Sequence, residues 1–295
     1  MAFIKKGKKE GGLFQMNHAL GQNMLKSKNV VTQIVEHGEI QPSDIILEIG
    51  PGVGNMTQVM LQKARKVFAV EKDPRMVVEL YKKFPKTQFP NLEIVQADIL
   101  QCQLPDFDLC ISNIPYNISS AIVFKLLGKP TFRRAVLMVQ KEFAQRISAH
   151  PRSEGWGRLA INTQLYATVQ QVMSVSRKNF VPAPEVDSAV ITIQPRNPQP
   201  NIDFPEWDGL IKLCFQRPHR TLHATFAKKK ILALLDQNRN NYLAQLGRAP
   251  EQEIGVFVNG VLENIQLSES RPIDLDIEDF YKLLQAFNEG GLHFQ

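Results

Sequence analysis

Apolar residues in the first two-thirds of the chain form short runs rich in Val, Ile and Leu. Between these runs, apolar positions recur every three or four residues. The runs are typical of buried strands and the longer spacing is typical of helices. We predict strands at 45–49, 67–71, 92–97, 109–113 and 135–139, and helices at 30–35, 56–64, 76–84 and 121–127. This alternation predicts an α/β fold, in which helices cover both faces of a mostly parallel sheet.

The pattern changes in the last third of the chain. A helical stretch at 159–169 is followed by apolar runs at 172–176 and 189–193, which could complete the sheet as an antiparallel pair. Four prolines then predict a linker: Pro195, Pro198, Pro200 and Pro205. Helical patterns follow at 207–215, 219–235, 242–246, 251–262 and 277–287, the last with Asp274 or Asp276 as its N-cap. We therefore expect a tail at 1–12, a sheet domain at 13–200 and a small helical domain at 201–295.

Composition is that of an ordinary globular protein, with 43% hydrophobic and 22% charged residues. The sequence has no apolar run of about 18 residues, and no apolar segment follows the lysines near Met1, so we expect neither a spanning helix nor a secretory signal. The cysteines Cys102, Cys110 and Cys214 form no C-x-x-C pair, which favours reduced thiols over disulfides or a zinc site. We expect an intracellular protein.

Charge is unevenly distributed along the chain. Residues 251–295 carry nine acidic side chains against Arg271 and Lys282, a net charge of −7, whereas residues 1–250 carry +13. The basic majority favours a polyanionic partner, although an ordinary solvated surface would also explain net charge alone. Two clusters strengthen the first interpretation: Lys5, Lys6, Lys8 and Lys9 in the tail, and Arg217, Arg220, Lys228, Lys229 and Lys230 in one later segment.

A glycine turn follows the first predicted strand of the sheet. It reads G-x-G-x-G, with Gly50, Gly52 and Gly54, rather than the G-x-G-x-x-G of dinucleotide sites. Glu71 ends the next strand, where it could reach ribose hydroxyls, and Asp98 follows the third strand, where it could accept a hydrogen bond from an adenine amino group. The alternative is that both are exposed acids at strand ends. Three successive strand ends with suitable groups favour an adenosine-containing cofactor, and the short glycine pattern favours S-adenosylmethionine over NAD.

The fourth predicted strand ends in Asn113-Ile114-Pro115-Tyr116. An exocyclic adenine amine is a poor nucleophile because its lone pair is delocalised into the ring. The Asn113 carboxamide and a backbone carbonyl near Ile114 could accept its hydrogens, Pro115 would fix the turn, and Tyr116 could stack on the base. Catalysis would then be positioning and electrostatics. A strand-ending turn with a packed tyrosine is the alternative.

These motifs resemble those of a known family, the KsgA-type small-subunit rRNA adenine N6,N6-dimethyltransferases, and more specifically its eukaryotic branch. The resemblance runs from about Gly11 to the C-terminus. It rests on 20–25, 48–54, 113–116 with 118–120, 140–142, 157–159 and 180–188, and for the eukaryotic branch on 206–210 and 276–294.

The resemblance implies a Rossmann-like S-adenosylmethionine-dependent methyltransferase that transfers two methyl groups to each of two adjacent adenosines near the 3′ end of small-subunit (18S) rRNA. It implies that Asn23 and Leu25 join Gly50, Gly52, Glu71, Asp98 and Asn113 at the cofactor, and that Phe180 pairs with Tyr116 to clamp the base. Asn23 stands where the eukaryotic branch commonly has His, and Ile114 where Leu is commoner. An aromatic residue such as Phe180 could also simply belong to the core.

The resemblance also implies partners and a location. We expect a monomer that acts on small-subunit rRNA in a pre-40S particle, in the nucleolus or nucleus and possibly also the cytoplasm, with no membrane. Arg217, His219 and Arg220 are expected to touch phosphates, as are Lys228 and Lys229. His219 and His223 lack a third ligand, so we expect no metal.

Two other classes of function stay open. One is an assembly factor of the same ancestry that binds pre-ribosomal RNA without chemistry. The other is a methylase with a different substrate, such as DNA adenine or large-subunit rRNA of the resistance type.

Overall fold

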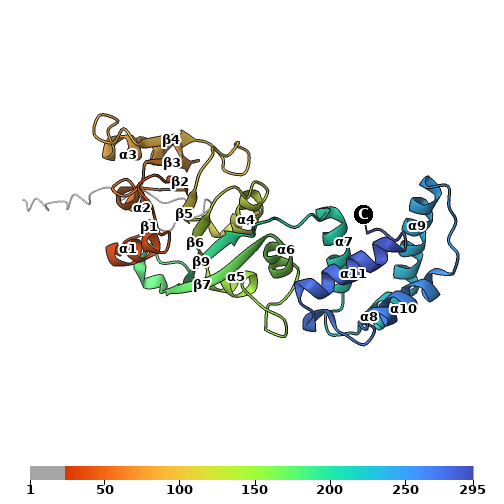
Figure 1. The fold of residues 1–295 in the computed structure, drawn as a ribbon. Helices are drawn as coiled ribbons and strands as arrows, with labels where there is room; N and C mark the ends of the chain where they lie inside the picture. Colours follow the sequence, from red (N-terminus) through yellow and green to blue (C-terminus); the bar gives the residue numbers. More distant parts are fainter. Residues whose placement is uncertain (1–23, 295) are drawn as a thin grey trace, which may run out of the picture.

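The computed structural model of the protein describes residues 24–294, which form a seven-stranded sheet followed by a helical unit (Figure 1). The strand order in the sheet is β4-β3-β2-β5-β6-β9-β7. Neighbours are parallel from β4 to β6, and β9 is antiparallel to both β6 and β7. The strands are β2 (Ile45–Ile49), β3 (Lys66–Glu71), β4 (Leu92–Gln96), β5 (Leu109–Asn113), β6 (Arg134–Gln140), β7 (Ala167–Val175) and β9 (Ser188–Pro195). The predicted fold class, including the antiparallel end of the sheet, is confirmed.

Helices cover both faces of this sheet. One apolar cluster packs α1, α2 and α3 on one face, and another packs α4 and α5 on the other. Their bounds are α1 (Lys28–Glu36), α2 (Asn55–Met60), α3 (Pro74–Lys83), α4 (Ser119–Leu127) and α5 (Lys141–Ile147). The sequence sets their ends: the Asp73 side chain caps the backbone N–H of Arg75 at the start of α3, and Pro74 occupies its first turn. The apolar and β-branched strands thus lie between two helical layers.

A small second sheet joins two distant segments. Strand β1 (Met24–Leu25) pairs antiparallel with β8 (Phe180–Val181), with Leu25 opposite Phe180. Leu25 and Phe180 are both buried in the cluster below α1 and α2. The pairing therefore fixes the beginning of the described chain against the core.

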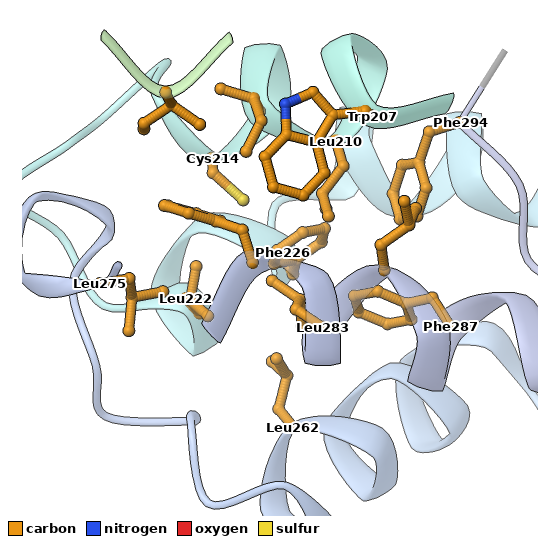
Figure 2. Packing of buried hydrophobic residues seen from close by; sticks show 14 of the residues in the cluster. Trp207, Leu210, Cys214, Leu222, Phe226, Leu262, Leu275, Leu283, Phe287 and Phe294 are labelled. Carbon is orange, nitrogen blue, oxygen red and sulfur yellow. The ribbon is translucent and has the colours of Figure 1, made fainter. Parts of the chain in front are cut away.

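A separate apolar core lies in the helical unit. It is built by α7 (Phe204–Cys214), α8 (Leu222–Phe226), α9 (Lys229–Gln245), α10 (Ile254–Asn264) and α11 (Ile277–Glu289). Figure 2 shows Trp207, Phe226, Leu283 and Phe287 packed together with Phe294 from the end of the chain. The Asp276 side chain caps α11 in a capping box with Asp279, which selects one of the two predicted caps.

Helix α6 (Arg158–Tyr166) connects the two units, because its buried Ala160, Ile161 and Leu165 belong to the helical core although the helix precedes β7. Polar contacts reinforce the junction. The Asn162 amide donates to Asp208 at 2.6 Å and accepts from the Trp207 indole at 3.1 Å, and Arg158 pairs with Asp208 at 2.8 Å. The chain changes from sheet to helices between Pro195 and Phe204, near the expected boundary, but the core of the second unit extends back to α6.

Several predicted helices differ from the structure; the predicted 56–64, for example, ends at Met60 in α2. Helix α6 ends at Tyr166 because Ala167 already pairs with Pro195 of β9, so the predicted 159–169 extended too far. The predicted 219–235 is two helices, because Lys228 has extended backbone and caps α9. The predicted 242–246 is the end of α9, which contains neither Gly nor Pro to stop it earlier.

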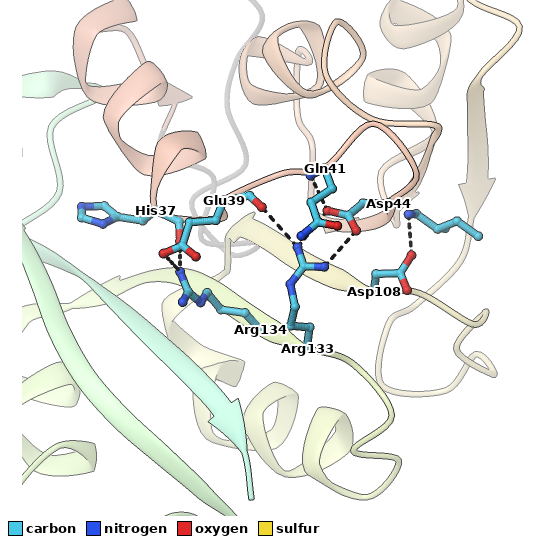
Figure 3. Close-up of polar contacts among 8 residues, drawn as sticks. His37, Glu39, Gln41, Asp44, Asp108, Arg133 and Arg134 are labelled. Carbon is cyan, nitrogen blue, oxygen red and sulfur yellow. Dashed lines mark hydrogen bonds and ion pairs between the residues drawn. The ribbon is translucent and has the colours of Figure 1, made fainter. Parts of the chain in front are cut away.

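Polar groups at the amino ends of the parallel strands pair with one another (Figure 3). Arg133 binds both carboxylate oxygens of Asp44 at 2.9 and 3.0 Å, and Arg134 pairs with Glu39. Asp108 accepts from the backbone N–H of Ile45 at 2.8 Å. Within residues 24–294, no helix combines the length and apolar character that crossing a bilayer needs. The predicted lysine tail at 1–12 lies outside the described residues.

Candidate active site

A cavity of about 490 Å³ opens at the carboxyl ends of β2, β3, β4 and β5. It is lined by the glycine turn after β2, by Glu71 at the end of β3, by Asp98 after β4 and by the 113–118 segment after β5. In a parallel sheet these ends meet at one edge, where ligands bind in open α/β folds. The volume is within the range of small-molecule and cofactor sites.

The glycine turn has the backbone that the sequence pattern requires. Gly50, Gly52 and Gly54 have φ of 65°, 57° and 74°, a region that other residues rarely adopt. A Cβ on Gly54 would approach Phe84 to 2.4 Å, so this glycine allows α2 to pack on α3. A Cβ on Gly52 would meet nothing within 4 Å, which leaves this part of the turn open toward the cavity.

The glycine turn and the turn after β5 lie side by side. The position of a Cβ on Gly50 is 4.0 Å from the Asn113 carbonyl oxygen and 3.9 Å from Pro115. On the other side of the turn, the Asn55 amide donates to the Leu25 carbonyl at 2.9 Å, which brings β1 to the same cavity. Residues separated by almost ninety positions in sequence therefore share one cleft.

Glu71 holds the shape of this cleft through backbone contacts. One carboxylate oxygen accepts from the Gly52 N–H at 3.2 Å and the other from the Asp73 N–H at 2.9 Å. Burial raises the pKa of Glu71, against the effect of these hydrogen bonds. A carboxylate has about four acceptor positions, so Glu71 can still accept a hydrogen bond from a ligand hydroxyl.

Asp98 is ionised more readily than an ordinary aspartate. Lys72 donates to one of its oxygens at 2.8 Å, and the Leu100 N–H donates to the other at 2.9 Å. The hydrogen bond from Lys72 is the main cause that lowers the pKa of Asp98. The cleft therefore presents a negatively charged acceptor where an adenine amino group was expected.

Glu48 lies beneath the glycine turn and is the most deeply buried acid of the cleft. It is 2% exposed, and the Thr57 hydroxyl donates to its carboxylate. Burial raises the pKa of Glu48 to about 8, with a further contribution from the charge of Glu71. At neutral pH this side chain therefore carries a proton, which avoids two adjacent buried negative charges.

The turn after β5 holds Tyr116 at the mouth of the cleft. The Ser119 hydroxyl donates to the carbonyls of Pro115 and Tyr116 at 3.3 and 3.1 Å, which ties the turn to the start of α4. Ile114 is buried in the core, whereas Asn113 and Tyr116 are half-buried and line the cavity. A carboxamide and an aromatic ring thus flank a space large enough for a planar base.

Comparisons with known proteins agree with this geometry. Residues 13–250 match the model of the family described as "Ribosomal RNA adenine dimethylase". A probable dimethyladenosine transferase of Dictyostelium discoideum is 43% identical over 288 residues, which cover 96% of this chain and 92% of the relative. The dimethyladenosine transferase of Saccharomyces cerevisiae is 40% identical over the same shares of the two chains. The protein belongs to the ribosomal RNA adenine dimethylase family.

Solved structures of dimethylases and related enzymes show the same fold. A dimethyladenosine transferase from Plasmodium falciparum superposes with a TM-score of 0.88 at 39% identity, covering 92% of this chain and all of that one. The 23S rRNA methyltransferase ErmE has a TM-score of 0.64 at 27% identity, covering 90% and all of the two chains. This member of the family is thus a methyltransferase enzyme with a Rossmann-like sheet.

Phe180 does not line the dimethylase cleft, although its strand partner Leu25 does. Phe180 is 2% exposed, belongs to the core cluster below α1 and α2, and is not among the residues that line the cavity. Its strand pairs with Leu25, and both side chains pack in the same core cluster. In this structure Phe180 is a core residue and Tyr116 lines the cleft without it, so the base clamp by Phe180 stays a prediction.

Asn23, which the resemblance also places at the cofactor, lies outside the described residues. Leu25 does line the cavity, as expected.

The predicted phosphate contacts of the dimethylase lie in the helical unit. Arg217, Arg220 and Lys229 are exposed, and Lys228 is half-buried between α8 and α9. Burial and the nearby charge of Arg217 lower the pKa of Lys228, so these two cations lie close enough to repel each other. Residues 24–294 contain no group of three or more His, Cys, Asp or Glu side chains suited to a metal.

Sequence reasoning missed three side chains that shape the cleft. Asn55 fixes β1, Thr57 binds Glu48, and Ser188 binds the hydroxyl of Tyr116 at 2.6 Å. Asn55 and Thr57 follow the glycine turn directly, and Ser188 ends the 180–188 motif, so their positions were visible. Their partners were not, because the contacts cross between elements.

Proposed function

We propose that this enzyme uses S-adenosylmethionine to dimethylate N6 of two adjacent adenosines near the 3′ end of small-subunit rRNA, in a precursor of the small subunit. The observation that carries the proposal is that the glycine turn and the Asn113–Tyr116 segment line one cavity side by side, so that a Cβ added to Gly50 would lie about 4 Å from Asn113 and Pro115. One cleft can therefore hold a methyl donor and a base together.

The residues of the cleft fit the donor. Open space at Gly52 admits a cofactor against the backbone, Glu71 offers acceptors for ribose hydroxyls, and ionised Asp98 offers one for an adenine amino group. Met24 and Leu25 would close the cleft from β1. When bound, S-adenosylmethionine supplies an electrophilic methyl group whose bond to sulfur breaks as the bond to N6 forms.

Asn113 and Tyr116 prepare the base for this attack. The Asn113 carboxamide oxygen and a carbonyl of the Ile114 turn accept the two N6 hydrogens, which draws the nitrogen toward tetrahedral geometry and localises its lone pair. Tyr116 stacks on the ring, a contact worth about 1 to 3 kcal/mol per base. The methylated nitrogen is acidic and releases its proton to water, so no general base is needed before attack.

Selection of RNA would come from shape and from an unpaired adenosine. A duplex adenine must leave its stack before N6 can enter such a cleft. The cations at Arg217, Arg220, Lys228 and Lys229 would bind phosphates and position the RNA without reading its sequence. We propose that the enzyme acts as a monomer in the nucleolus or nucleus, and also in the cytoplasm where it encounters precursors of the small subunit.

The alternative substrate is large-subunit rRNA, favoured by the likeness to ErmE. The greater identity to the dimethyladenosine transferases, over nearly their whole length, supports the small subunit instead. A binding-only assembly factor is a further alternative, against which the intact cleft argues.

Methyl transfer to immature small subunits, to naked rRNA of each subunit and to DNA tests these choices. We expect dimethyladenosine on small-subunit rRNA alone, read by mass spectrometry. Dimethylation confined to large-subunit rRNA would overturn the proposal that small-subunit rRNA is the substrate. Binding of small subunits without methyl transfer would support the assembly factor.

A further inference from the structure

The hydroxyl of Tyr116 is bound by a residue far along the chain. Its oxygen lies 2.6 Å from Oγ of Ser188, which is completely buried at the start of β9. Tyr116 belongs to a short 3-10 turn (Tyr116–Ile118), whose three residues include none that is fully buried. A side chain on a turn is held less firmly than one on a sheet, so the contact joins a mobile type of element to a rigid one.

Ser188 is fixed on both sides by the sheet. It pairs with Gln140 of β6 and with Val175 of β7. The residue before it is also tied down: the Asp187 carbonyl accepts from the Lys141 N–H at 3.0 Å, and its side chain accepts from the Arg177 N–H at 2.9 Å. The Ser188 hydroxyl is therefore an anchor whose position the turn at Tyr116 cannot easily shift.

The hydrogen bond with Ser188 restricts the orientation of the Tyr116 ring, which lines the cleft. The orientation of a tyrosine ring is set by two side-chain torsions, and stacking on a base requires one of their combinations. A hydrogen bond at the far end of the ring restricts both torsions at once. Burial raises the pKa of Tyr116, so the phenol keeps its proton at neutral pH and the hydrogen bond persists.

We propose that Ser188 is a positioning residue for methyl transfer, which holds the Tyr116 ring in the orientation that receives the target base. This rests on the proposed function. It also gives the 180–188 motif a role in the cleft: its Phe180 end supports the core, and its Ser188 end reaches the cleft through Tyr116.

A matched pair of substitutions separates the hydroxyl from its surroundings. Ser188→Thr keeps the hydroxyl and Ser188→Val replaces it with a methyl group of the same size, so both add the same bulk to this buried position. We expect kcat of the Val variant to be about tenfold below that of the Thr variant, with the affinity for S-adenosylmethionine unchanged. Equal kcat in the two variants would overturn the proposal.

Removing the other partner gives an independent test. Tyr116→Phe keeps the ring and loses the same hydrogen bond, so we expect a similar loss of kcat. The double variant Tyr116→Phe, Ser188→Ala should lose no more than either single variant, because each removes the one shared contact. Losses that multiply to about a hundredfold would show that the two residues act separately.

Ser148→Ala provides the control for loss of a serine hydroxyl. This hydroxyl donates to the Ala144 carbonyl at 2.7 Å at the end of α5 and is not among the residues lining the cleft. We expect its kcat to equal that of the wild type. A comparable loss in Ser148→Ala would assign the effect at Ser188 to general destabilisation and overturn a specific role.

A spectroscopic measurement distinguishes failure of this inference from failure of the proposed function. In protein with ¹³C-labelled tyrosine, the Tyr116 signal is assigned by its loss in Tyr116→Phe and titrated with pH. Ser188→Ala should raise the Tyr116 pKa further, because the Ser188 hydrogen bond favours the phenolate. An unchanged titration rejects the anchor, whereas a shifted titration in a protein that methylates no rRNA keeps the anchor and rejects the proposed function.

Discussion

The acidic side chains at the two ends of the parallel sheet differ in how their most deeply buried members are held. At the amino ends, Asp44 and Glu39 are paired with Arg133 and Arg134 and so are neutralised by the protein itself (Figure 3). At the carboxyl ends, the buried carboxylates of Glu48 and Glu71 are held by a hydroxyl and by backbone N–H groups, and the more exposed Asp98 pairs with Lys72 at 2.8 Å.

This difference appears in the pKa values along a single strand. Burial alone would raise the pKa of Asp44, just before β2, but hydrogen bonds from Arg133 and the Gln41 N–H lower it. Within β2, burial raises the pKa of Glu48 to about 8. One end of the strand is thus built for stability and the other keeps acceptors and a proton near a cleft, which is typical of functional sites.

The strongest test at the carboxyl end is Glu71→Ala. It removes the acceptors expected for ribose hydroxyls and the contacts that hold Gly52 and Asp73, so we expect binding of S-adenosylmethionine to fall at least about a hundredfold, beyond routine detection. Calorimetry measures the affinity and circular dichroism checks the fold. Unchanged affinity would reject the assignment of Glu71.

Phe180→Ala tests whether a residue beside the cleft supports it or acts in it. Because the ring is buried among core residues, we expect the free energy of unfolding to drop by about 3 to 5 kcal/mol. Tyr116→Ala should instead lower turnover far more than stability or cofactor affinity. Urea unfolding and steady-state kinetics on both variants distinguish a structural role from a role at the base. A Phe180→Ala variant that is stable but inactive would support Phe180 as a base clamp.

Glu48→Gln tests the buried proton. The pKa of Glu48 is raised on folding, so its contribution to stability is complete below its unfolded value and is lost as pH rises toward about 8. We expect wild-type stability to fall by about 2 kcal/mol more than that of the Gln variant between pH 6 and 8. Asp44→Asn is the matched control: the lowered pKa of Asp44 stabilises the fold above its unfolded value and this stabilisation is lost only in acid, so the stability difference between wild type and Asp44→Asn should stay constant between pH 6 and 8. Parallel stability curves for Glu48→Gln and wild type would contradict this.

Arg133→Met tests the amino end, with the smallest effect. It leaves Asp44 buried without its arginine, but Arg133 is itself partly exposed and screened by water, so we expect a loss of about 1 kcal/mol of stability. Turnover and cofactor affinity should match the wild type. A large loss of activity in this variant would mean that the two ends are not independent.

Much of this arrangement could be predicted from the sequence. The strands at 45–49 and 109–113 are correct to the residue, because continuous apolar runs between polar turns leave little choice, and Glu71 and Asp98 were located by the ends of their strands. The break at Lys228 and the orientation of Phe180 could not be predicted. The position of Phe180 depends on its pairing with the distant Leu25, and the break at Lys228 depends on how the neighbouring helices α8 and α9 pack, which the apolar pattern does not encode.

The close approach of Phe294 to α7 affects the order in which parts of the chain can fold during synthesis. A Cβ on Gly209 would lie 1.9 Å from the Phe294 carbonyl oxygen, so the last described residue sits directly on a helix made some eighty residues earlier. Helix α6, synthesised before β7, also buries its face in that core. During translation the sheet can form first. The apolar side chains that α6 contributes to the second core then stay uncovered until the residues near 294 emerge. A nascent chain of this enzyme therefore exposes an apolar surface to chaperones until the residues near 294 have been synthesised.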